Sequence, residues 1–308
     1  MRILVTGATG FVGRWLIREL EAAGHDAVGA PGSAQLDFTD RGAVADLVAA
    51  VRPDAIAHLA GVAFARDAAR DPARAIAVNA GGTQTIVEAA SRLKGSVPLL
   101  VSGSSEVYGR PDPGSLPLRE EAPLITDQPY GLSKLAQERV ALELGAERGV
   151  PVVVTRSFNH TGPGQRPDFV APALARRVIQ ARQTGLRDIV VGNLDVRRDL
   201  GDVRDVVRAY RLLIEGLLDG GVPPGQVVNV ATGRSVTIRR VLEILSAAAG
   251  IPTTPRIDPE LVRDNDPLEI VGDSAALRRL TGWRPTIPLE RTLADLILSI
   301  ETEGEPTG

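Results

Sequence analysis

A tyrosine and a lysine, Tyr130 and Lys134, stand four residues apart in the segment PYGLSKLAQE. A helix would place both side chains on one face. Lys134 is one of only two lysines among 35 lysine and arginine residues. A compact ammonium can lower the pKa of a neighbouring phenol, ordinarily near 10, and leave it accessible, which the broader guanidinium fork cannot. The pair predicts proton transfer by Tyr130 with Lys134 as its activator; a chance spacing on a helix surface is the alternative.

Polar residues follow the apolar run PLLV at the end of a predicted strand: Ser102, Ser104, Ser105 and Glu106. The carboxyl ends of parallel strands are where such sheets place ligands. A serine hydroxyl there can hydrogen-bond a carbonyl oxygen of a substrate while Tyr130 transfers the proton. For each single serine, a plain serine-rich turn remains the alternative.

Three glycines, Gly7, Gly10 and Gly13, form the loop TGATGFVG between a predicted strand and a predicted helix. Such a loop brings backbone N–H groups at a helix N-terminus close to a pyrophosphate, which indicates a bound dinucleotide. The end of the second predicted strand, APG at 30–32, has no carboxylate to hold the ribose 2′-hydroxyl of NAD, and Arg14 is a candidate for the 2′-phosphate of NADP. NADP is therefore favoured, with NAD possible; Arg14 as a solvated residue is the alternative.

Short apolar runs alternate with longer amphipathic patterns. Strands are predicted over 2–7, 54–60, 98–103 and 151–157, and helices over 11–23, 72–93 and 130–148. Apolar strands separated by helices indicate a parallel sheet covered on both faces, an α/β Rossmann doubly wound fold. We expect an NAD(P)-binding domain over 1–161, with later strands near 188–191 and 226–230, and a smaller, interleaved substrate-binding lobe mainly over 162–308.

The composition excludes several classes of function. A net charge of −3 with both signs interspersed provides no basic field for nucleic acid or a membrane surface. Cysteine is absent, and His25, His58 and His160 are too scattered to indicate a metal site. The start MRILVTG runs into a predicted strand, and no run of about 18 apolar residues occurs. We expect a cytoplasmic protein without a bound metal.

The chain as a whole resembles the extended short-chain dehydrogenase/reductase family. The motifs that carry this resemblance are, in chain order, TGATGFVG, HLAG at 58–61, NAGGT at 79–83, SSEVYG at 104–109 and YGLSK at 130–134. The segments that resemble the GDP-sugar branch of the family are RSFNHTGPGQ at 156–165, VGNLDVRRDLGDVRDVVRAY at 191–210 and RDNDPLEIVGD at 263–273. Two residues depart from the family pattern, because Ser157 and Asp264 stand where proline is usual.

The resemblance implies a role for each matching residue. Tyr130 would be the catalytic acid/base, Lys134 its activator and ribose ligand, and Ser104 the hydroxyl that polarises the carbonyl. Glu106 stands where the dehydratases of the family carry a base. Cofactor contacts are implied for Gly7, Gly10, Phe11, Val12, Gly13, Arg14, Asp37, Phe38, Leu59, Ala60, Gly61, Asn79, Tyr130, Lys134 and His160. Substrate contacts are implied for Ser104, Ser105, Tyr130, Asn159, Asn193, Arg198, Arg263 and Asp266.

The implied activity is NAD(P)H-dependent reduction of the C4 ketone of GDP-4-keto-6-deoxy-D-mannose to GDP-D-rhamnose. The resemblance also implies a homodimer paired through the helices at 72–93 and 130–148. The glycine loop followed by Arg-Trp-Leu resembles the reductases more closely than the dehydratases. The alternatives are 4,6-dehydration of GDP-mannose, another nucleotide-sugar epimerase or reductase, and a non-catalytic NADP-sensing module. Such a module has no use for Tyr130, Lys134 and a strand-end serine together.

Overall fold

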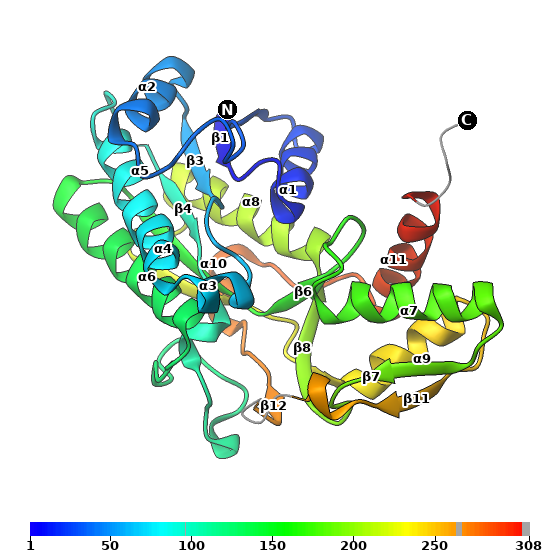
Figure 1. Ribbon diagram of the computed structural model, residues 1–308. Helices are drawn as coiled ribbons and strands as arrows, with labels where there is room; N and C mark the ends of the chain where they lie inside the picture. Colours follow the sequence, from blue (N-terminus) through cyan, green and yellow to red (C-terminus); the bar gives the residue numbers. More distant parts are fainter. Residues whose placement is uncertain (96, 263–266, 304–308) are drawn as a thin grey trace.

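The computed structural model describes residues 1–95, 97–262 and 267–303, which form a helix-covered sheet beside a smaller lobe (Figure 1). The sheet has six parallel strands in the order β2-β1-β3-β4-β5-β9. These strands are β1 (Arg2–Thr6), β2 (Asp26–Gly29), β3 (Ala55–His58), β4 (Leu99–Ser102), β5 (Val152–Ser157) and β9 (Gln226–Val230). Both β3 and β5 are buried along their whole length, as expected of strands covered on both faces.

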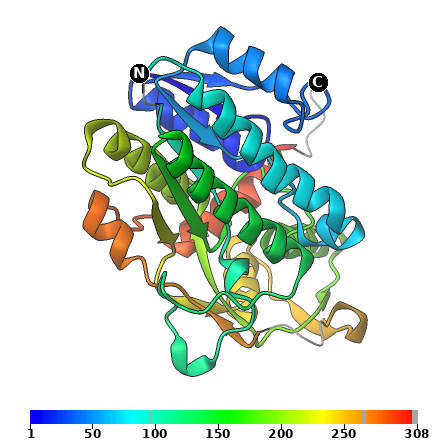
Figure 2. The same cartoon turned by 90° about the vertical axis from the view of Figure 1, so that its left-hand side faces the viewer.

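Helices pack on both faces of this sheet. One face carries α1 (Phe11–Ala22), α8 (Val203–Asp219) and α10 (Ala275–Thr281). The other carries α2 (Arg41–Val51), α4 (Pro72–Ile76), α5 (Gly82–Ser91) and α6 (Pro129–Arg148), with the short α3 (Ala65–Arg70) against α6. Figure 2 shows α5 and α6 side by side over the strands. Among the described residues, no helix combines the length and the apolar character needed to cross a membrane.

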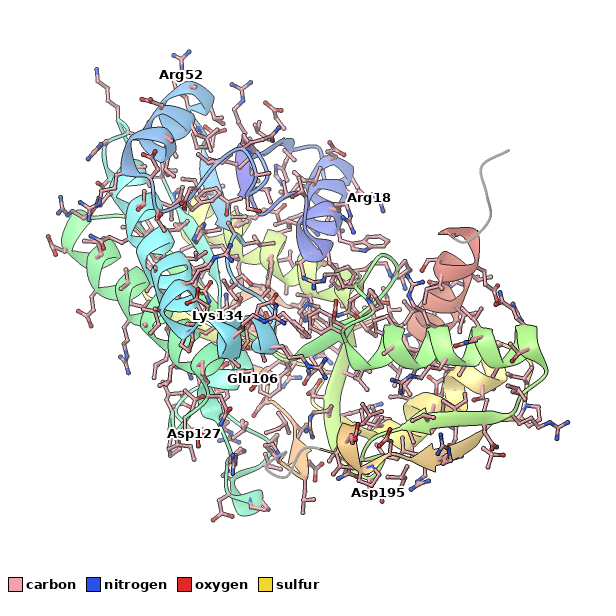
Figure 3. All side chains as sticks on the ribbon, in the orientation of Figure 1. Arg18, Arg52, Glu106, Asp127, Lys134 and Asp195 are labelled. Carbon is pink, nitrogen blue, oxygen red and sulfur yellow. The ribbon has the colours of Figure 1, made fainter. Side chains whose placement is uncertain are left out.

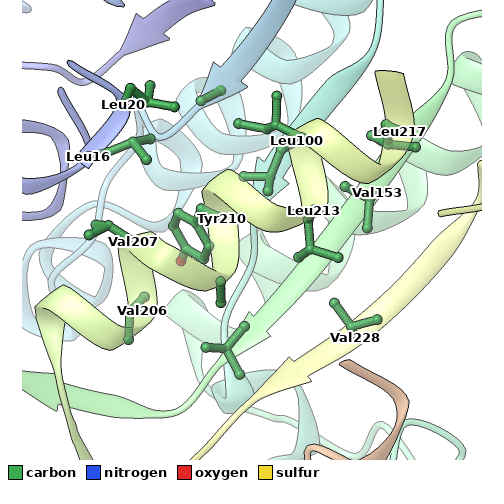
Figure 4. Close-up of a cluster of buried hydrophobic side chains, with 14 of the residues drawn as sticks. Leu16, Leu20, Leu100, Val153, Val206, Val207, Tyr210, Leu213, Leu217 and Val228 are labelled. Atoms are coloured by element: carbon green, nitrogen blue, oxygen red, sulfur yellow. The ribbon is translucent and has the colours of Figure 1, made fainter. Parts of the chain in front are cut away.

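The alternation of strand side chains produces two cores, one on each face of the sheet. Ile3 and Val5 of β1 join the core on the α8 side, whereas Leu4 between them joins the core on the α5 side. In the first core, Leu16 of α1 and Tyr210 of α8 are buried above the strands (Figure 4). Burying one such leucine contributes about 1.5–3 kcal/mol. These contacts fix the strand ends that carry the candidate site.

The helix expected over 72–93 is divided. After α4 ends at Ile76, a π-helical turn, η1 (Ala77–Gly81), precedes α5. A π-helical turn contains one more residue than an α-helical turn, and such turns are frequent at functional sites. Asn79 lies in this turn and is completely buried.

The lobe has a core of its own. Its helices are α7 (Val170–Thr184), α9 (Ile238–Ala248) and α11 (Leu289–Glu303), and its two-stranded parallel sheet is β7 (Asp188–Val191) with β11 (Thr254–Ile257). A further small sheet around β8 (Arg197–Asp202) contains β6 (Asn159–Thr161), β10 (Ser235–Thr237) and β12 (Glu269–Ile270). The short 3₁₀ turns are η2 (Ser105–Tyr108), η3 (Pro113–Ser115) and η4 (Pro259–Leu261).

One predicted strand belongs elsewhere. The segment 226–230 is β9 and pairs with β5, but the placement of 188–191 in the same sheet was wrong, because β7 pairs with β11. Ile189 and Val191 face the lobe core while Asp188 is exposed, so β7 needs apolar cover on one face only. A short apolar run does not identify its partner strand. That the domain over 1–161 binds NAD(P) and the lobe mainly over 162–308 binds the substrate stays a proposal.

Candidate active site

The glycine loop packs tightly against the end of β3. Gly7 has a φ of +68°, and a Cβ atom on it would lie 2.9 Å from the Ala60 nitrogen. A Cβ atom on Gly13 would lie 2.1 Å from the Gly7 carbonyl oxygen, and Gly10 N–H donates to that oxygen at 3.0 Å. Phe11 and Val12 begin α1 directly behind the loop. The loop therefore exposes backbone at a helix N-terminus, which fits a pyrophosphate.

A buried threonine joins the ends of β1 and β3. Thr6 Oγ1 accepts the N–H groups of Leu59 and Ala60 at 3.1 and 3.0 Å, and lies 2.9 Å from His58 Nδ1. Because both acceptor positions of the hydroxyl are occupied, it donates its proton to Nδ1, and Nε2 of His58 carries the ring proton. That Nε2 atom is buried and has no hydrogen-bond partner among the described residues. Burial, followed by the charge of Lys134, lowers the pKa of His58 to about 3.

Tyr130 lies in the first turn of α6 and hydrogen-bonds Ser104 at the end of β4. Burial raises the pKa of Tyr130 well above its usual value; the Ser104 hydrogen bond opposes this, and Glu106 adds to it. The net shift of the Tyr130 pKa is upward, opposite to the direction that we expected from Lys134, because desolvation is the largest influence. Ser104 Oγ accepts the Glu106 N–H at 3.2 Å and keeps its own proton to donate. The pair therefore presents two neutral O–H groups.

Lys134 is buried one helical turn behind Tyr130. Its Nζ donates to the Ser102 carbonyl at 2.9 Å and to Gln137 Oε1 at 2.8 Å. Burial lowers the pKa of Lys134 to about 8. A Cβ atom on Gly61 would lie 2.5 Å from Asn79 Oδ1 and 3.9 Å from Nζ, so the bare backbone at that position lets the Asn79 side chain pack beside the ammonium.

Asn79 holds the elements around this lysine together. Its Oδ1 accepts the Val62 N–H at 2.8 Å, and its Nδ2 donates to the Val62 carbonyl at 3.1 Å and to Ser133 Oγ at 2.8 Å. Ser133 Oγ donates to the Tyr130 carbonyl at 2.8 Å. Asn79 thus positions the segment after β3 and the first turn of α6, while its polar atoms are all directed at protein groups.

Two other predicted cofactor residues lie in the segment between β2 and α2. Asp37 is exposed, and a hydrogen bond from the Thr39 backbone, followed by one from the Thr39 hydroxyl, lowers the pKa of its carboxyl. Phe38 is buried, with its ring centre 5.8 Å from that of His58. The structure therefore brings Phe38 close to the β3 end and leaves Asp37 at the surface.

β6 and the segment after it pack on the start of α1. The His160 ring is stacked on Phe11 with 6.2 Å between ring centres, and burial lowers the pKa of His160. Arg14 donates to the carbonyls of Thr9 and Gly164 at 2.8 and 3.1 Å. The Arg14 guanidinium is therefore already engaged at the edge of the loop.

Two of the predicted substrate residues come from β8 and from the loop before it. Arg198 Nη1 donates to the carbonyls of Arg197 and Pro267 at 2.8 and 2.9 Å, and Asn193 Oδ1 accepts the Asp195 N–H at 2.9 Å. The remaining ones are Asn159, exposed on β6, Ser105, half-buried in η2, and Arg263 and Asp266, which lie outside the described residues. Figure 3 shows Lys134 and Glu106 on the α6 side and Asp195 in the lobe.

Three residues near the site were missed by the sequence reasoning. Gln137 and Thr83 contact the lysine network, and the Tyr210 hydroxyl lies 2.7 Å from Ser157 Oγ and 3.2 Å from Ser102 Oγ. Ser157 was noted only as a departure from the family pattern, and its hydroxyl proves to be the partner of Tyr210. The spacing of Gln137 one turn after Lys134 was the available signal.

Comparisons with known proteins agree with this geometry. The model of the NAD dependent epimerase/dehydratase family matches residues 3–231. The chain is 36% identical to GDP-6-deoxy-D-mannose reductase from Pseudomonas aeruginosa, over 98% of this chain and 97% of that protein. It is 30% identical to UDP-glucose 4-epimerase from Mycolicibacterium smegmatis, over 96% of this chain and 97% of that protein.

The chain is also similar to solved structures along nearly its whole length. The structure of RMD from Pseudomonas aeruginosa complexed with NADPH matches with a TM-score of 0.89 at 34% identity, over 98% of this chain and 99% of that one. UDP-glucose 4-epimerase from Thermus thermophilus in complex with NAD matches with a TM-score of 0.84 at 26% identity, over 98% and 99%. The family expected from the motifs is confirmed: the chain belongs to the NAD dependent epimerase/dehydratase family, enzymes of the extended short-chain dehydrogenase/reductase type.

Proposed function

We propose that this protein reduces the C4 ketone of GDP-4-keto-6-deoxy-D-mannose with NADPH and forms GDP-D-rhamnose. The observation that carries the proposal is the pair of neutral hydroxyls, Tyr130 and Ser104, at the end of β4, with Lys134 behind them and the glycine loop beside them. The similarity to a GDP-6-deoxy-D-mannose reductase along nearly the whole chain supports the choice of substrate.

The chain's own residues account for the proton transfer. NADPH, when bound, supplies the hydride. Ser104 donates a hydrogen bond to the ketone oxygen, and Tyr130, held protonated by its raised pKa, transfers its proton to that oxygen as negative charge develops. The Lys134 ammonium then stabilises the tyrosinate that remains.

Binding of both ligands follows from the arrangement of the loops. Backbone at Gly7, Gly10 and Gly13 would hold the pyrophosphate, and Lys134 beside Gly61 would hold a ribose. Arg14 lies at the rim of the same loop as the candidate for the 2′-phosphate, and NAD is the weaker alternative. Asn159, Asn193 and Arg198, with Arg263 and Asp266, are proposed for the GDP moiety because a diphosphate favours fork-shaped donors.

A nicotinamide absorbance assay tests this function. Purified protein is mixed with NADPH and GDP-4-keto-6-deoxy-D-mannose, and the product is identified as GDP-D-rhamnose by chromatography. The Tyr130→Phe variant serves as the control. No loss of NADPH absorbance, together with conversion of GDP-mannose itself, would replace the reductase by the dehydratase.

Dehydration of GDP-mannose is kept as a second candidate because of one observation. Glu106 is exposed, and its charge contributes to the raised pKa of Tyr130, so the two groups lie close together. A carboxylate at that place is suited to removing a proton from the sugar ring. Turnover of GDP-mannose that is lost in Glu106→Gln would favour this activity.

A homodimer through α4, α5 and α6 is also proposed. Ile76 on α4 and Leu132 on α6 have exposed fractions of 45% and 44%, which is the kind of surface that a helical interface covers. The molar mass in solution, measured by light scattering, tests it, with Leu132→Glu as the variant expected to dissociate. The cytoplasmic location stays a prediction.

A further inference from the structure

A chain of buried hydrogen bonds leads from Lys134 into the interface between α6 and α5. Lys134 Nζ donates to Gln137 Oε1 at 2.8 Å, and Gln137 Nε2 donates to Thr83 Oγ1 at 3.0 Å. Thr83 Oγ1 donates to the Asn79 carbonyl at 2.7 Å. Each of these residues is at most 5% exposed. These hydrogen bonds connect Lys134 to the π-helical turn, where the side chain of Asn79 is hydrogen-bonded to Val62 and Ser133.

The donors and acceptors fix which way the Gln137 amide faces. The Thr83 hydroxyl has one proton and gives it to the Asn79 carbonyl, so its oxygen can only accept from Gln137. The amide nitrogen therefore faces Thr83, and the amide oxygen faces Lys134. A rotated amide would direct N–H groups at the ammonium, which has donors only.

The ammonium has three N–H donors, and two of them are assigned. One goes to the Ser102 carbonyl and one to Gln137 Oε1. No acceptor for the third is present among the residues that the structure describes, so this N–H remains available to a ligand. In a neutral amine the two remaining N–H groups satisfy the two protein acceptors, and a lone pair replaces the third donor. Only the charged lysine can donate to a ligand and to both acceptors.

We propose that Gln137, oriented by Thr83, is a positioning residue that holds Lys134 in its ammonium form and directs the third N–H at the ribose of the dinucleotide. The inference rests on the proposed function, in which Lys134 acts beside Tyr130. Burial brings the pKa of Lys134 down to about 8. One acceptor that favours the charged form therefore has a large influence on the fraction of ammonium near neutral pH.

The other ionisable groups near this site come from four elements. His58 on β3 is neutral, with its pKa lowered mainly by burial and further by Lys134. Tyr130 on α6 is kept protonated by burial, and Glu106 on η2 and Tyr210 on α8 act on its pKa in the same direction. Among the described residues, no carboxylate is hydrogen-bonded to Lys134 Nζ. Gln137 is therefore the side chain best placed to change the charge of the lysine.

The presence of only two lysines permits a direct test. Lysine labelled with ¹³C at Cε gives one signal from Lys134 and one from the exposed Lys94, which is the internal reference. We expect the titration midpoint of Lys134 to fall by about one pH unit in Gln137→Leu, which loses an acceptor, and to rise by about one unit in Gln137→Glu, which gains a carboxylate. Unchanged midpoints, or shifts in the same direction, would overturn the proposal.

Two threonines of α5 provide a matched control. Thr83 and Thr85 are both buried and both donate to the carbonyl four residues earlier, but only Thr83 accepts from Gln137. Thr83→Val should lower the Lys134 midpoint by about half a pH unit, because the Gln137 amide is released. Thr85→Val should leave it unchanged. Equal effects of the two substitutions would contradict the role given to Thr83.

The titration is read without substrate, so it separates this inference from the proposed function. With NADPH and the ketosugar, the high-pH limb of kcat should move to lower pH in Gln137→Leu and to higher pH in Gln137→Glu. Opposite shifts of the lysine signal without ketosugar turnover in any variant would support the positioning role and refute the reductase. Ketosugar turnover with unshifted lysine signals would support the reductase and refute the positioning role of Gln137.

Discussion

The two sides of the candidate site are built differently. On the sheet side, Lys134 and Asn79 are buried and hydrogen-bonded to groups on neighbouring elements. On the lobe side, Asn193 and Arg198 are half-buried; Asn193 accepts the nearby Asp195 N–H, and Arg198 donates to the backbone carbonyls of Arg197 and Pro267. A buried polar group that loses its partner costs about 1–3 kcal/mol, whereas a half-exposed one recovers water. Changes on the sheet side should therefore affect the rate, and changes on the lobe side should affect binding.

The largest expected effect comes from Tyr130→Phe, which removes the proton donor and keeps the ring. General acid catalysis contributes about 10²–10⁴-fold, so kcat should fall by about 10³-fold. Ketosugar turnover and NADPH binding by fluorescence are measured together. If NADPH binding falls as steeply as kcat, the assignment of the sheet side to rate and of the lobe side to binding is wrong.

Lys134→Arg should keep the fold and lower kcat by about 10²-fold. The guanidinium is too broad for the buried position between the Ser102 carbonyl and Gln137, and its planar fork cannot reproduce three diverging donors. Circular dichroism checks the fold, and steady-state assays check the rate. Lys94→Arg, at an exposed position, is the control and should leave both unchanged. A near-normal rate in Lys134→Arg would show that the charge alone is sufficient.

His58 should make the sheet side sensitive to acid. The unfolded chain binds a proton at this histidine below about pH 6.5, whereas the folded chain does not until about pH 3, so stability is lost as the pH falls through that window. Protonation of His58 alone should raise the equilibrium constant for unfolding by up to about tenfold for each pH unit by which the pH falls. Urea unfolding at several pH values tests it, and His58→Asn should flatten the slope. An unchanged slope in His58→Asn would assign the acid sensitivity to other groups.

The smallest effect is expected on the lobe side. Arg198→Lys should raise KM for the nucleotide sugar about fivefold with little change in kcat, because a fork-shaped donor is replaced by a single ammonium. Arg197→Lys is the matched control, since successive residues of β8 point to opposite faces. A fall in kcat as large as that of Lys134→Arg would remove the distinction between the two sides.

The local parts of this molecule could be predicted from the sequence. The glycine loop, Tyr130 with Lys134, and the serines after β4 each lie within one turn or loop, where spacing is sufficient. The pairing of β7 with β11 and the contact between Gln137 and Thr83 join segments that lie far apart along the chain, and no local pattern encodes them. The direction of the Tyr130 pKa also escaped prediction, because desolvation depends on the packed surroundings rather than on one neighbour.

The π-helical turn at Ala77–Gly81 makes the site dependent on the number of residues in one helix. Deleting Gly81, which follows Asn79 in that turn, would allow α4 and α5 to become one regular α-helix. Everything before the deletion would then rotate by about 100° relative to α5, and Asn79 would turn away from Val62 and Ser133. The loss of one codon, without any change of side-chain chemistry, would therefore separate the lysine network from the segment that follows β3.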